Sequence, residues 1–172
     1  QTIENCYNNS TEKAILFIWN GDRNLHIAIQ TAIENKFLIN QIGAWVKNSF
    51  VFSPGCIFHK ILEYCAICLK DGHKPELNEQ YVKNQDNLFD LEFKDFSAHL
   101  DAWYYKRDTT KNYEHPTQKP VELAFPALFA ATKEEDIILD CFGGSGSTLI
   151  ACEEYKRKCF IMELDPYYCS II

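Results

Sequence analysis

A glycine-rich turn set between two apolar stretches is the feature that most constrains the fold of this chain. The apolar run Ile137–Leu139 leads into Asp140–Thr148, which carries three glycines within four positions, and Leu149–Cys152 follows directly. A short apolar run is typical of a buried strand, and glycines allow the positive φ angles of a tight turn. A second apolar run, Cys159–Met162, comes after the stretch expected to be helical. The order predicts a strand, turn, helix and strand unit.

The same unit has the features of a nucleotide-binding site. The first N–H groups of a helix that opens at a glycine turn point at any ligand placed there. Glu163 ends the second run, about twenty residues past the glycines, where such units place the acid that binds ribose hydroxyls. A phosphate-binding loop is excluded because no lysine precedes Ser147 or Thr148. The remaining alternative, a tight turn without a ligand, is weakened by Glu163.

The upstream part of the chain alternates between strand and helix patterns. Residues 14–19 form an apolar run that predicts a strand, and residues 23–36 have the apolar spacing of an amphipathic helix. Two further strands are expected over 41–47 and 62–69, and a long insertion or DNA-contacting segment over 71–112.

Further helices are expected after Pro120, delayed or kinked by Pro126, and at Pro166. Alternating strands and helices predict an α/β fold with a mostly parallel sheet and helices on both faces. With 172 residues, of which 47% are hydrophobic, the chain fits a single domain, 1–172.

Charge and hydropathy restrict the partners. The net charge of −7 argues against binding nucleic acid by electrostatics alone, although basic residues gather between Trp103 and Pro120. No apolar run approaches the length of a membrane span, and the first residues lack a signal-peptide pattern. We therefore expect a soluble cytoplasmic protein that does not bind membranes.

The eight cysteines lie mostly in apolar runs, which is typical of small buried side chains and not of a disulfide framework. A zinc site built from Cys56, His59, Cys65 and Cys68 is the alternative. Residues three apart in a strand point to opposite faces, so Cys65 and Cys68 would not converge on one ion. We therefore predict no metal site.

Three blocks of the sequence together resemble one family. They are His115–Leu123, Asp140–Leu149 and Glu163–Tyr168. In this order they resemble the permuted, S-adenosylmethionine-dependent DNA methyltransferases that modify the exocyclic amino groups of adenine or cytosine. The resemblance covers roughly the last third of the chain closely, while Trp45–Asn48 and Glu63–Tyr64 fit the family's middle region more loosely.

The resemblance implies a Rossmann-like methyltransferase fold with an incomplete sheet, and S-adenosyl-L-methionine over the carboxyl ends of the strands. It implies that the glycine turn surrounds the methionine part of the cofactor and that Glu163 binds the ribose. The His-Pro-Thr block would close the amino-acid end. The implied cofactor-binding residues are Thr117, Lys119, Asp140, Phe142, Gly143, Gly144, Gly146 and Glu163. Cys141 replaces the proline usual at its position.

The resemblance also exposes a missing motif. The family's catalytic tetrapeptide should precede the 14–19 strand, and nothing from Gln1 to Lys13 matches it. Asp165–Tyr168 looks similar but follows the second strand, where the family has an Asp-Pro helix start. We therefore assign no catalytic residue in this chain and expect a fragment that begins after the catalytic strand.

The implied activity is methylation of a base flipped out of double-stranded DNA, in restriction and modification, with adenine favoured over cytosine. Two alternatives stay open: a catalytically inactive methyltransferase-like binding module or partner subunit, and the dinucleotide-binding domain of an oxidoreductase. His115–Pro120 argues against the oxidoreductase.

DNA contacts are expected where aromatic and basic residues mix. The candidates are Lys47, Trp103, Tyr104, Lys106 and Arg107. An aromatic edge packed on the core, with solvated cations, is the competing interpretation. Besides DNA, a restriction endonuclease or a second copy of the chain is a candidate partner.

Overall fold

A computed structural model describes residues 1–52, 54–85, 99–107 and 118–172. The helices are α1 (Thr2–Asn9), α2 (Leu25–Glu34), α3 (Glu79–Gln85), the 3-10 helix η3 (Val121–Ala124), α5 (Phe125–Ala131), α6 (Ser147–Glu154) and α7 (Pro166–Cys169). The strands are β1 (Ile15–Asn20), β2 (Phe37–Val51), β3 (Lys60–Lys70), β4 (Ala102–Trp103), β5 (Ile137–Asp140) and β6 (Lys158–Ile161). No helix in these ranges is long and apolar enough to span a membrane.

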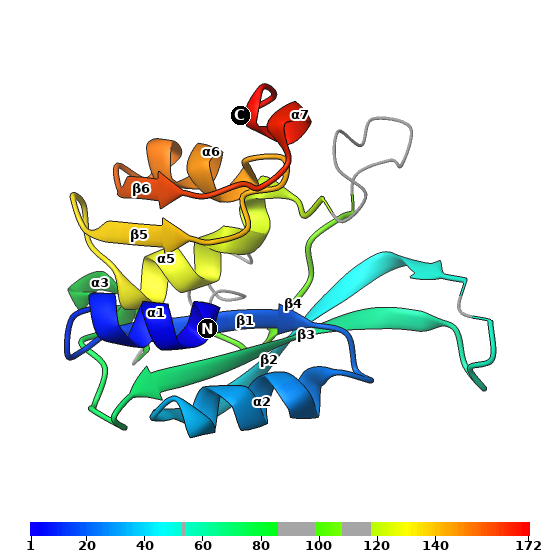
Figure 1. The fold of residues 1–172 in the computed structure, drawn as a ribbon, viewed down its shortest axis with the longest axis horizontal. Helices are drawn as coiled ribbons and strands as arrows, with labels where there is room; N and C mark the ends of the chain where they lie inside the picture. The colour runs from blue at the N-terminus through cyan, green and yellow to red at the C-terminus, as the bar shows by residue number, and fades with distance from the viewer. Residues whose placement is uncertain (53, 86–98, 108–117) are drawn as a thin grey trace.

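The strands form two sheets. One has the order β1-β3-β2-β4 and the other pairs β5 with β6 (Figure 1). β5 and β6 are parallel, as the strand, turn, helix and strand pattern predicted, and so are β2 and β4. The long β1–β3 and β2–β3 ladders are antiparallel.

The expectation of a mostly parallel sheet is therefore wrong for the four-stranded sheet. β2 ends at Val51 and β3 begins at Lys60, and so short a connection forces neighbouring strands to run in opposite directions. The α/β class itself is confirmed.

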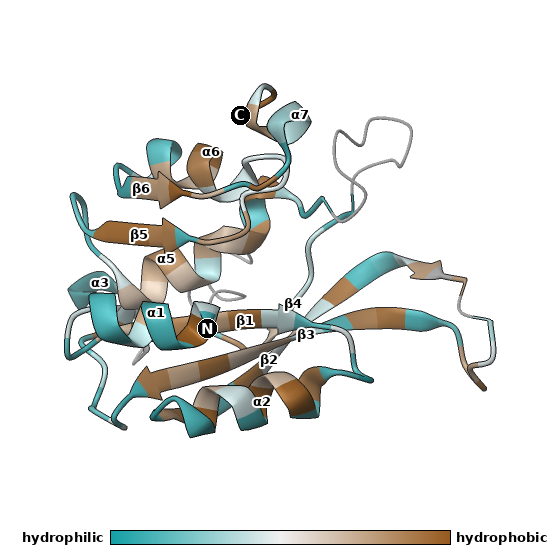
Figure 2. Cartoon of the chain, in the orientation of Figure 1, coloured by the Kyte–Doolittle hydropathy of each residue, from teal (hydrophilic) through white to brown (hydrophobic). Residues whose placement is uncertain are grey.

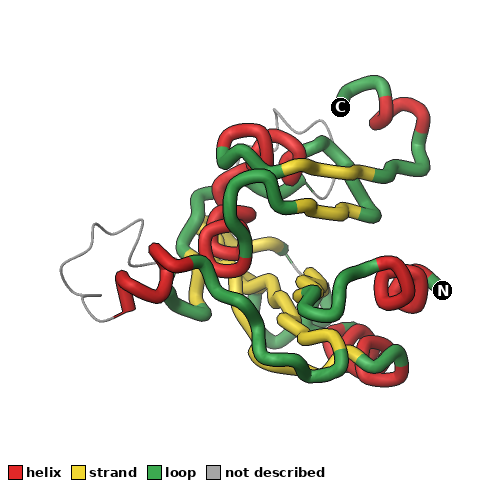
Figure 3. Tube along the Cα trace, turned by 90° about the vertical axis from the view of Figure 1, so that its left-hand side faces the viewer, coloured by secondary structure: helices red, strands yellow, loops and turns green. Residues whose placement is uncertain are grey.

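Helices cover both faces of the four-stranded sheet. On one face, α1 and α2 pack on a cluster that contains Ala32, Phe37, Ala66 and Cys68. On the other face lies a cluster of Trp45, Cys65, Trp103 and Leu123, the last of which comes from η3. Figure 3 shows the strands between helices from separate parts of the chain. Alternate residues of β3 thus enter two different cores, as strand geometry requires.

A third cluster holds the β5–β6 pair. Ile138 and Cys159 turn toward α5 and α6, where Leu128, Ala151 and Cys152 are buried. The alternate residues Ile137, Leu139 and Phe160 are exposed on the opposite face. Figure 2 shows the hydrophobic residues of β5 and β6 in brown. The pair therefore has one packed face and one exposed face.

Three elements among the described residues were not predicted. Helix α1 is held by Lys70, whose ammonium donates to the carbonyl oxygens of Tyr7 at 2.5 Å and Ser10 at 2.8 Å. A cation at the carbonyl end of a helix stabilises it. Within the expected insertion 71–112, the described residues form α3 and β4, and β4 pairs with Ala44 and Trp45 of β2. Part of that segment therefore belongs to the sheet.

Candidate functional site

The glycine turn is held in shape by its own hydrogen bonds. The Asp140 carboxylate accepts the backbone N–H of Phe142 at 2.9 Å, immediately after β5. Gly143 donates to the carbonyl oxygen of Met162 at 2.8 Å, and Gly146 donates to the carbonyl oxygen of Gly143 at 2.9 Å. The turn is thus attached to the end of β6 as well as to β5, and it reaches α6 as one fixed unit.

The three glycines of the turn have different reasons to be glycine. Gly144 has a φ of 56°, and Gly146, the N-cap of α6, has a φ of 79°. These angles lie in the left-handed region, which other residues adopt at a cost. A Cβ on Gly143 would instead lie 2.7 Å from Cγ1 of Ile161. Gly143 is therefore required by close packing on β6.

Glu163 faces the glycine turn. Its Oε2 accepts the N–H of Gly144 at 2.7 Å, and its Oε1 accepts the N–H groups of Leu164 at 2.7 Å and Asp165 at 2.9 Å. The sequence placed these groups nineteen positions apart, and the structure brings them into contact. The acid and the turn therefore lie at the same carboxyl edge of the β5–β6 pair, where open α/β sheets bind ligands.

Exposed apolar side chains surround this edge. Phe142 is 76% exposed and Leu164 is 95% exposed. Leu164 lines a hollow together with Glu163, Asp165, Pro166 and Tyr168. Large exposed apolar side chains beside a carboxylate fit a ligand that has both a flat ring and hydroxyl groups. The residues present at this edge therefore fit a nucleoside.

The remaining predicted cofactor residues are placed differently. The ammonium of Lys119 lies 2.9 Å from Oε1 of Glu63, a residue of β3, and 5.8 Å from the centre of the Trp19 ring. The charge of Lys119 is thus paired with a carboxylate on the four-stranded sheet. Thr117 lies outside the described residues, as does His115.

Two of the predicted DNA contacts, Trp103 and Lys47, are largely buried in the structure. Trp103 is 4% exposed and packs against Gly43 and Trp19, so it belongs to the core and cannot stack on a base without leaving it. The ammonium of Lys47 lies 3.0 Å from Glu63, and its side chain is 12% exposed. The competing interpretation of a packed aromatic edge holds for Trp103. Tyr104 and Lys106 are exposed, and Arg107 is half-buried.

The structure also bears on two further interpretations of the sequence, the helix start at Asp165 and the zinc site. Asp165 is the N-cap of α7, and its side chain accepts the N–H of Tyr167 at 2.9 Å. Asp165–Tyr168 is therefore a helix start, as predicted. Cys65 and Cys68 lie in different core clusters on opposite faces of β3, which separates two of the three cysteines of the zinc hypothesis.

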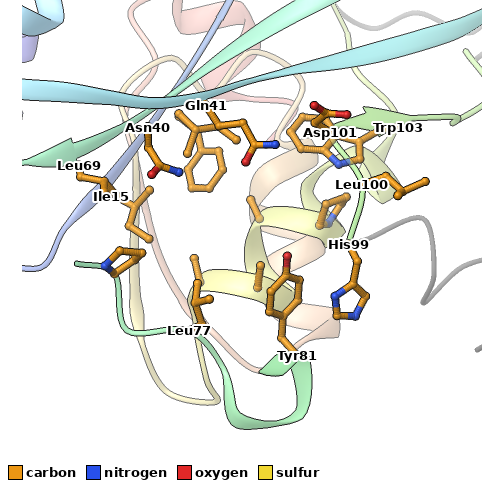
Figure 4. Close-up of a pocket in the computed structure, with 17 residues that line it drawn as sticks. Ile15, Asn40, Gln41, Leu69, Leu77, Tyr81, His99, Leu100, Asp101 and Trp103 are labelled. Carbon is orange, nitrogen blue, oxygen red and sulfur yellow. The ribbon is translucent and has the colours of Figure 1, made fainter. Parts of the chain in front are cut away.

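Two features had no signal in the sequence. Sγ of Cys6, in α1, lies 3.6 Å from Sγ of Cys141, in the glycine turn. A cavity of about 110 Å³ also lies between the four-stranded sheet and α5. Figure 4 shows Asn40, Gln41 and Trp103 on its sheet side, with Tyr81 and His99 opposite. Its lining comes from segments far apart in the chain, so spacing could not reveal it.

The fold and the site together define a class: an α/β protein with a glycine-rich turn and an acid after the second strand of a parallel pair. Comparison with known proteins identifies the family. The family model described as DNA methylase matches residues 1–172. The chain belongs to this DNA methylase family.

Individual relatives match part of their own length. The type II methyltransferase M2.LlaDCHI of Lactococcus lactis subsp. cremoris is 35% identical over 83 residues, which cover 46% of this chain and 31% of the relative. M2.DpnII of Streptococcus pneumoniae is 35% identical over 105 residues, which cover 58% of this chain and 38% of the relative. The chain thus spans well under half the length of these curated relatives.

Solved structures match nearly the whole chain. The crystal structure of the M1.HpyAVI–SAM complex superposes with a TM-score of 0.71 at 22% identity, over 98% of this chain and 78% of the other. The PvuII DNA methyltransferase, named as cytosine-N4-specific, gives 0.70 at 16% identity, over 94% and 63%. At these identities the likeness establishes the fold, and it confirms the predicted Rossmann-like methyltransferase fold.

Proposed function

We propose that this chain is the S-adenosyl-L-methionine-binding part of a DNA methyltransferase that acts on an exocyclic amino group. The observation that carries the proposal is the contact between Gly144 and Glu163, which brings the predicted methionine-binding turn and the predicted ribose-binding acid to one edge. Membership in the DNA methylase family supports it.

In the proposed complex, Asp140, Phe142 and the three glycines of the turn border the methionine part of the cofactor. Glu163 accepts hydrogen bonds from the ribose hydroxyls, and Leu164 covers the adenine ring. When bound, the cofactor supplies a methyl group on sulfonium. The chain holds the cofactor in one orientation. This positioning lowers the entropy cost of the methyl transfer, on the order of several kcal/mol.

We further propose that the target is a flipped base in double-stranded DNA, with adenine favoured over cytosine, in a cytoplasmic restriction and modification system. Transfer to the amino group would leave S-adenosylhomocysteine and release one proton. Tyr104, Lys106 and Arg107 remain proposed DNA contacts. Digestion of methylated DNA followed by mass spectrometry distinguishes N6-methyladenine from N4-methylcytosine. Appearance of N4-methylcytosine alone would overturn the adenine assignment.

Titration of the full-length protein with S-adenosyl-L-methionine by calorimetry tests the site. We expect Glu163→Ala to weaken binding by more than about tenfold, because the ribose hydroxyls lose a charged acceptor. Glu153→Ala, on the exposed side of α6, is the matched control and should bind as the parent does. Unchanged affinity in Glu163→Ala would remove the basis of the site assignment.

A further inference from the structure

Glu63 holds two lysines from different parts of the chain with one carboxylate. Its Oε2 lies 3.0 Å from Nζ of Lys47, on the neighbouring strand β2, and its Oε1 lies 2.9 Å from Nζ of Lys119. The side chains of Glu63, Lys47 and Lys119 are 23%, 12% and 26% exposed. Each oxygen thus has its own ammonium in a partly buried place, where charge-assisted hydrogen bonds are strong.

Aromatic rings support both lysines from another side. Lys47 lies over the Trp45 ring at 4.9 Å, and Lys119 lies over the Trp19 ring at 5.8 Å. A cation over an aromatic face gains additional attraction. Trp45 is itself 2% exposed within the core cluster on this face of the sheet. The two ammonium groups are therefore fixed by the sheet and not only by Glu63.

Lys119 connects this arrangement to the proposed cofactor site. The next residue, Pro120, is buried and is the N-cap of η3. In η3, Leu123 enters the cluster of Trp45, while Val121 and Ala124 pack on the cluster of α6. Helix α6 begins at Gly146 of the glycine turn. A continuous series of contacts thus runs from Glu63 through Lys119 and η3 to the glycine turn.

The same end of β2 also holds the segment that contains Tyr105. The indole N–H of Trp45 donates to the carbonyl oxygen of Tyr105 at 2.8 Å, and the Asn48 side-chain oxygen accepts the N–H of Arg107 at 2.9 Å. The described segments that end at Arg107 and begin at Gln118 are therefore both attached next to Glu63.

We infer that Glu63 is a positioning residue for the cofactor site: it fixes Lys119, and through Lys119 the register of η3 against α6 and the glycine turn. This inference rests on the proposed function. It also assigns Lys119 a different role from the one that the sequence suggested, since Lys119 would act through its ion pair and not by touching the cofactor.

The test is the affinity of the full-length protein for S-adenosyl-L-methionine, measured by calorimetry together with thermal melting. Glu63→Gln keeps the size of the side chain but leaves two ammonium groups without a counter-charge. We expect binding to weaken on the order of tenfold, the scale expected when one partner of a partly buried charge pair is lost. Glu134→Gln is the matched control, because its ion pair with Lys156 is exposed, with side chains 64% and 68% exposed.

A double-mutant cycle separates positioning from general stability. Lys119→Met should weaken cofactor binding to a similar degree. The affinity of the double variant should be at most about twofold lower than that of either single variant. If Glu63→Gln fails to fold, Glu63→Met, which also removes the charge at similar size, replaces it in the cycle. Parent-like affinity of the Glu63 variant, or fully additive losses, would overturn the inference. A parent protein that does not bind the cofactor would instead overturn the proposed function.

Discussion

The backbone N–H of Gly144 and the carboxylate of Glu163 lie 2.7 Å apart, so the turn after β5 and the acid after β6 form one hydrogen-bonded unit. Neither group can move far without the other. A change in the shape of the turn should therefore displace the acid, although the two lie on different strands. Substitutions in the turn are expected to act on both stability and ligand affinity.

Gly146→Ala should lower the free energy of unfolding by about 1 to 2 kcal/mol, because alanine resists the left-handed φ of 79° at this N-cap. A Cβ there would also lie 3.3 Å from Cγ1 of Ile172. Gly21→Ala is the control, since its Cβ would meet nothing within 4 Å. It should change stability by no more than about 0.5 kcal/mol. Urea unfolding of both variants measures this difference, and equal losses of unfolding free energy would contradict the prediction.

Trp103 and Tyr104 are neighbours in sequence with opposite expected effects. Trp103→Ala should destabilise the protein by about 3 to 5 kcal/mol, because it removes a large side chain from the core. Tyr104, at 55% exposed, should cost no more than about 0.5 kcal/mol when changed to alanine. Tyr104→Ala should instead weaken DNA binding in a gel-shift titration. A stable Trp103→Ala protein would show that the indole is not part of the core.

Glu63 should make stability depend on pH in the acid range. Burial alone would raise the pKa of Glu63, but the ammonium groups of Lys119 and Lys47 outweigh it and hold the pKa below its ordinary value of 4.5. A carboxyl with a lowered pKa in the folded protein stabilises it above the ordinary pKa, and that contribution is lost as pH falls through the lowered value.

Urea midpoints of the parent and of Glu63→Gln, measured from pH 7 to pH 3, test this dependence. The difference in urea midpoint between the two proteins should be largest at neutral pH. It should narrow below about pH 4.5, where the parent begins to lose the stabilisation by the Glu63 carboxylate. A gap that stays constant down to pH 3 would contradict the prediction.

Cys141 should resist alkylation in the folded protein. Burial, together with the contact to the Cys6 thiol, raises the pKa of Cys141 to about 11, so little thiolate is present at pH 8. Cys169 is exposed and provides an internal comparison. Treatment with iodoacetamide at pH 8, followed by peptide mass spectrometry, should find Cys169 modified well before Cys141. The difference should vanish in urea; equal rates in the folded protein would refute the prediction.

The sequence was most informative where local chemistry dictates the backbone. The glycines after Leu139 and the helix start at Asp165 depend on φ angles and capping, which neighbouring residues determine. The delay of the helix after Pro120 is of the same kind, and the structure has η3 there before α5. These features agree with the predictions because neighbouring residues determine their backbone conformation, while contacts with β6 then hold the turn in place.

Features that depend on distant contacts were missed. Helix α1 is held by Lys70, which lies sixty residues from Ser10 in the chain. The antiparallel direction of β3 depends on which strands pair, and alternation of helices and strands does not reveal pairing when a hairpin interrupts it. Lys47 and Trp103 looked like a basic and an aromatic surface, since composition alone cannot distinguish an exposed side chain from a buried one.

The division into two sheets has a consequence for dynamics. A two-stranded sheet is only marginally stable by itself, so the β5–β6 pair depends on α5 and α6 for its order. Local unfolding should open this pair at a lower free energy than β3, whose amides lie between two neighbouring strands. Amide hydrogens of Ile138 and Phe160 should therefore exchange with solvent before those of Cys65 and Ile67, and any ligand that binds at the glycine turn should slow the first group selectively.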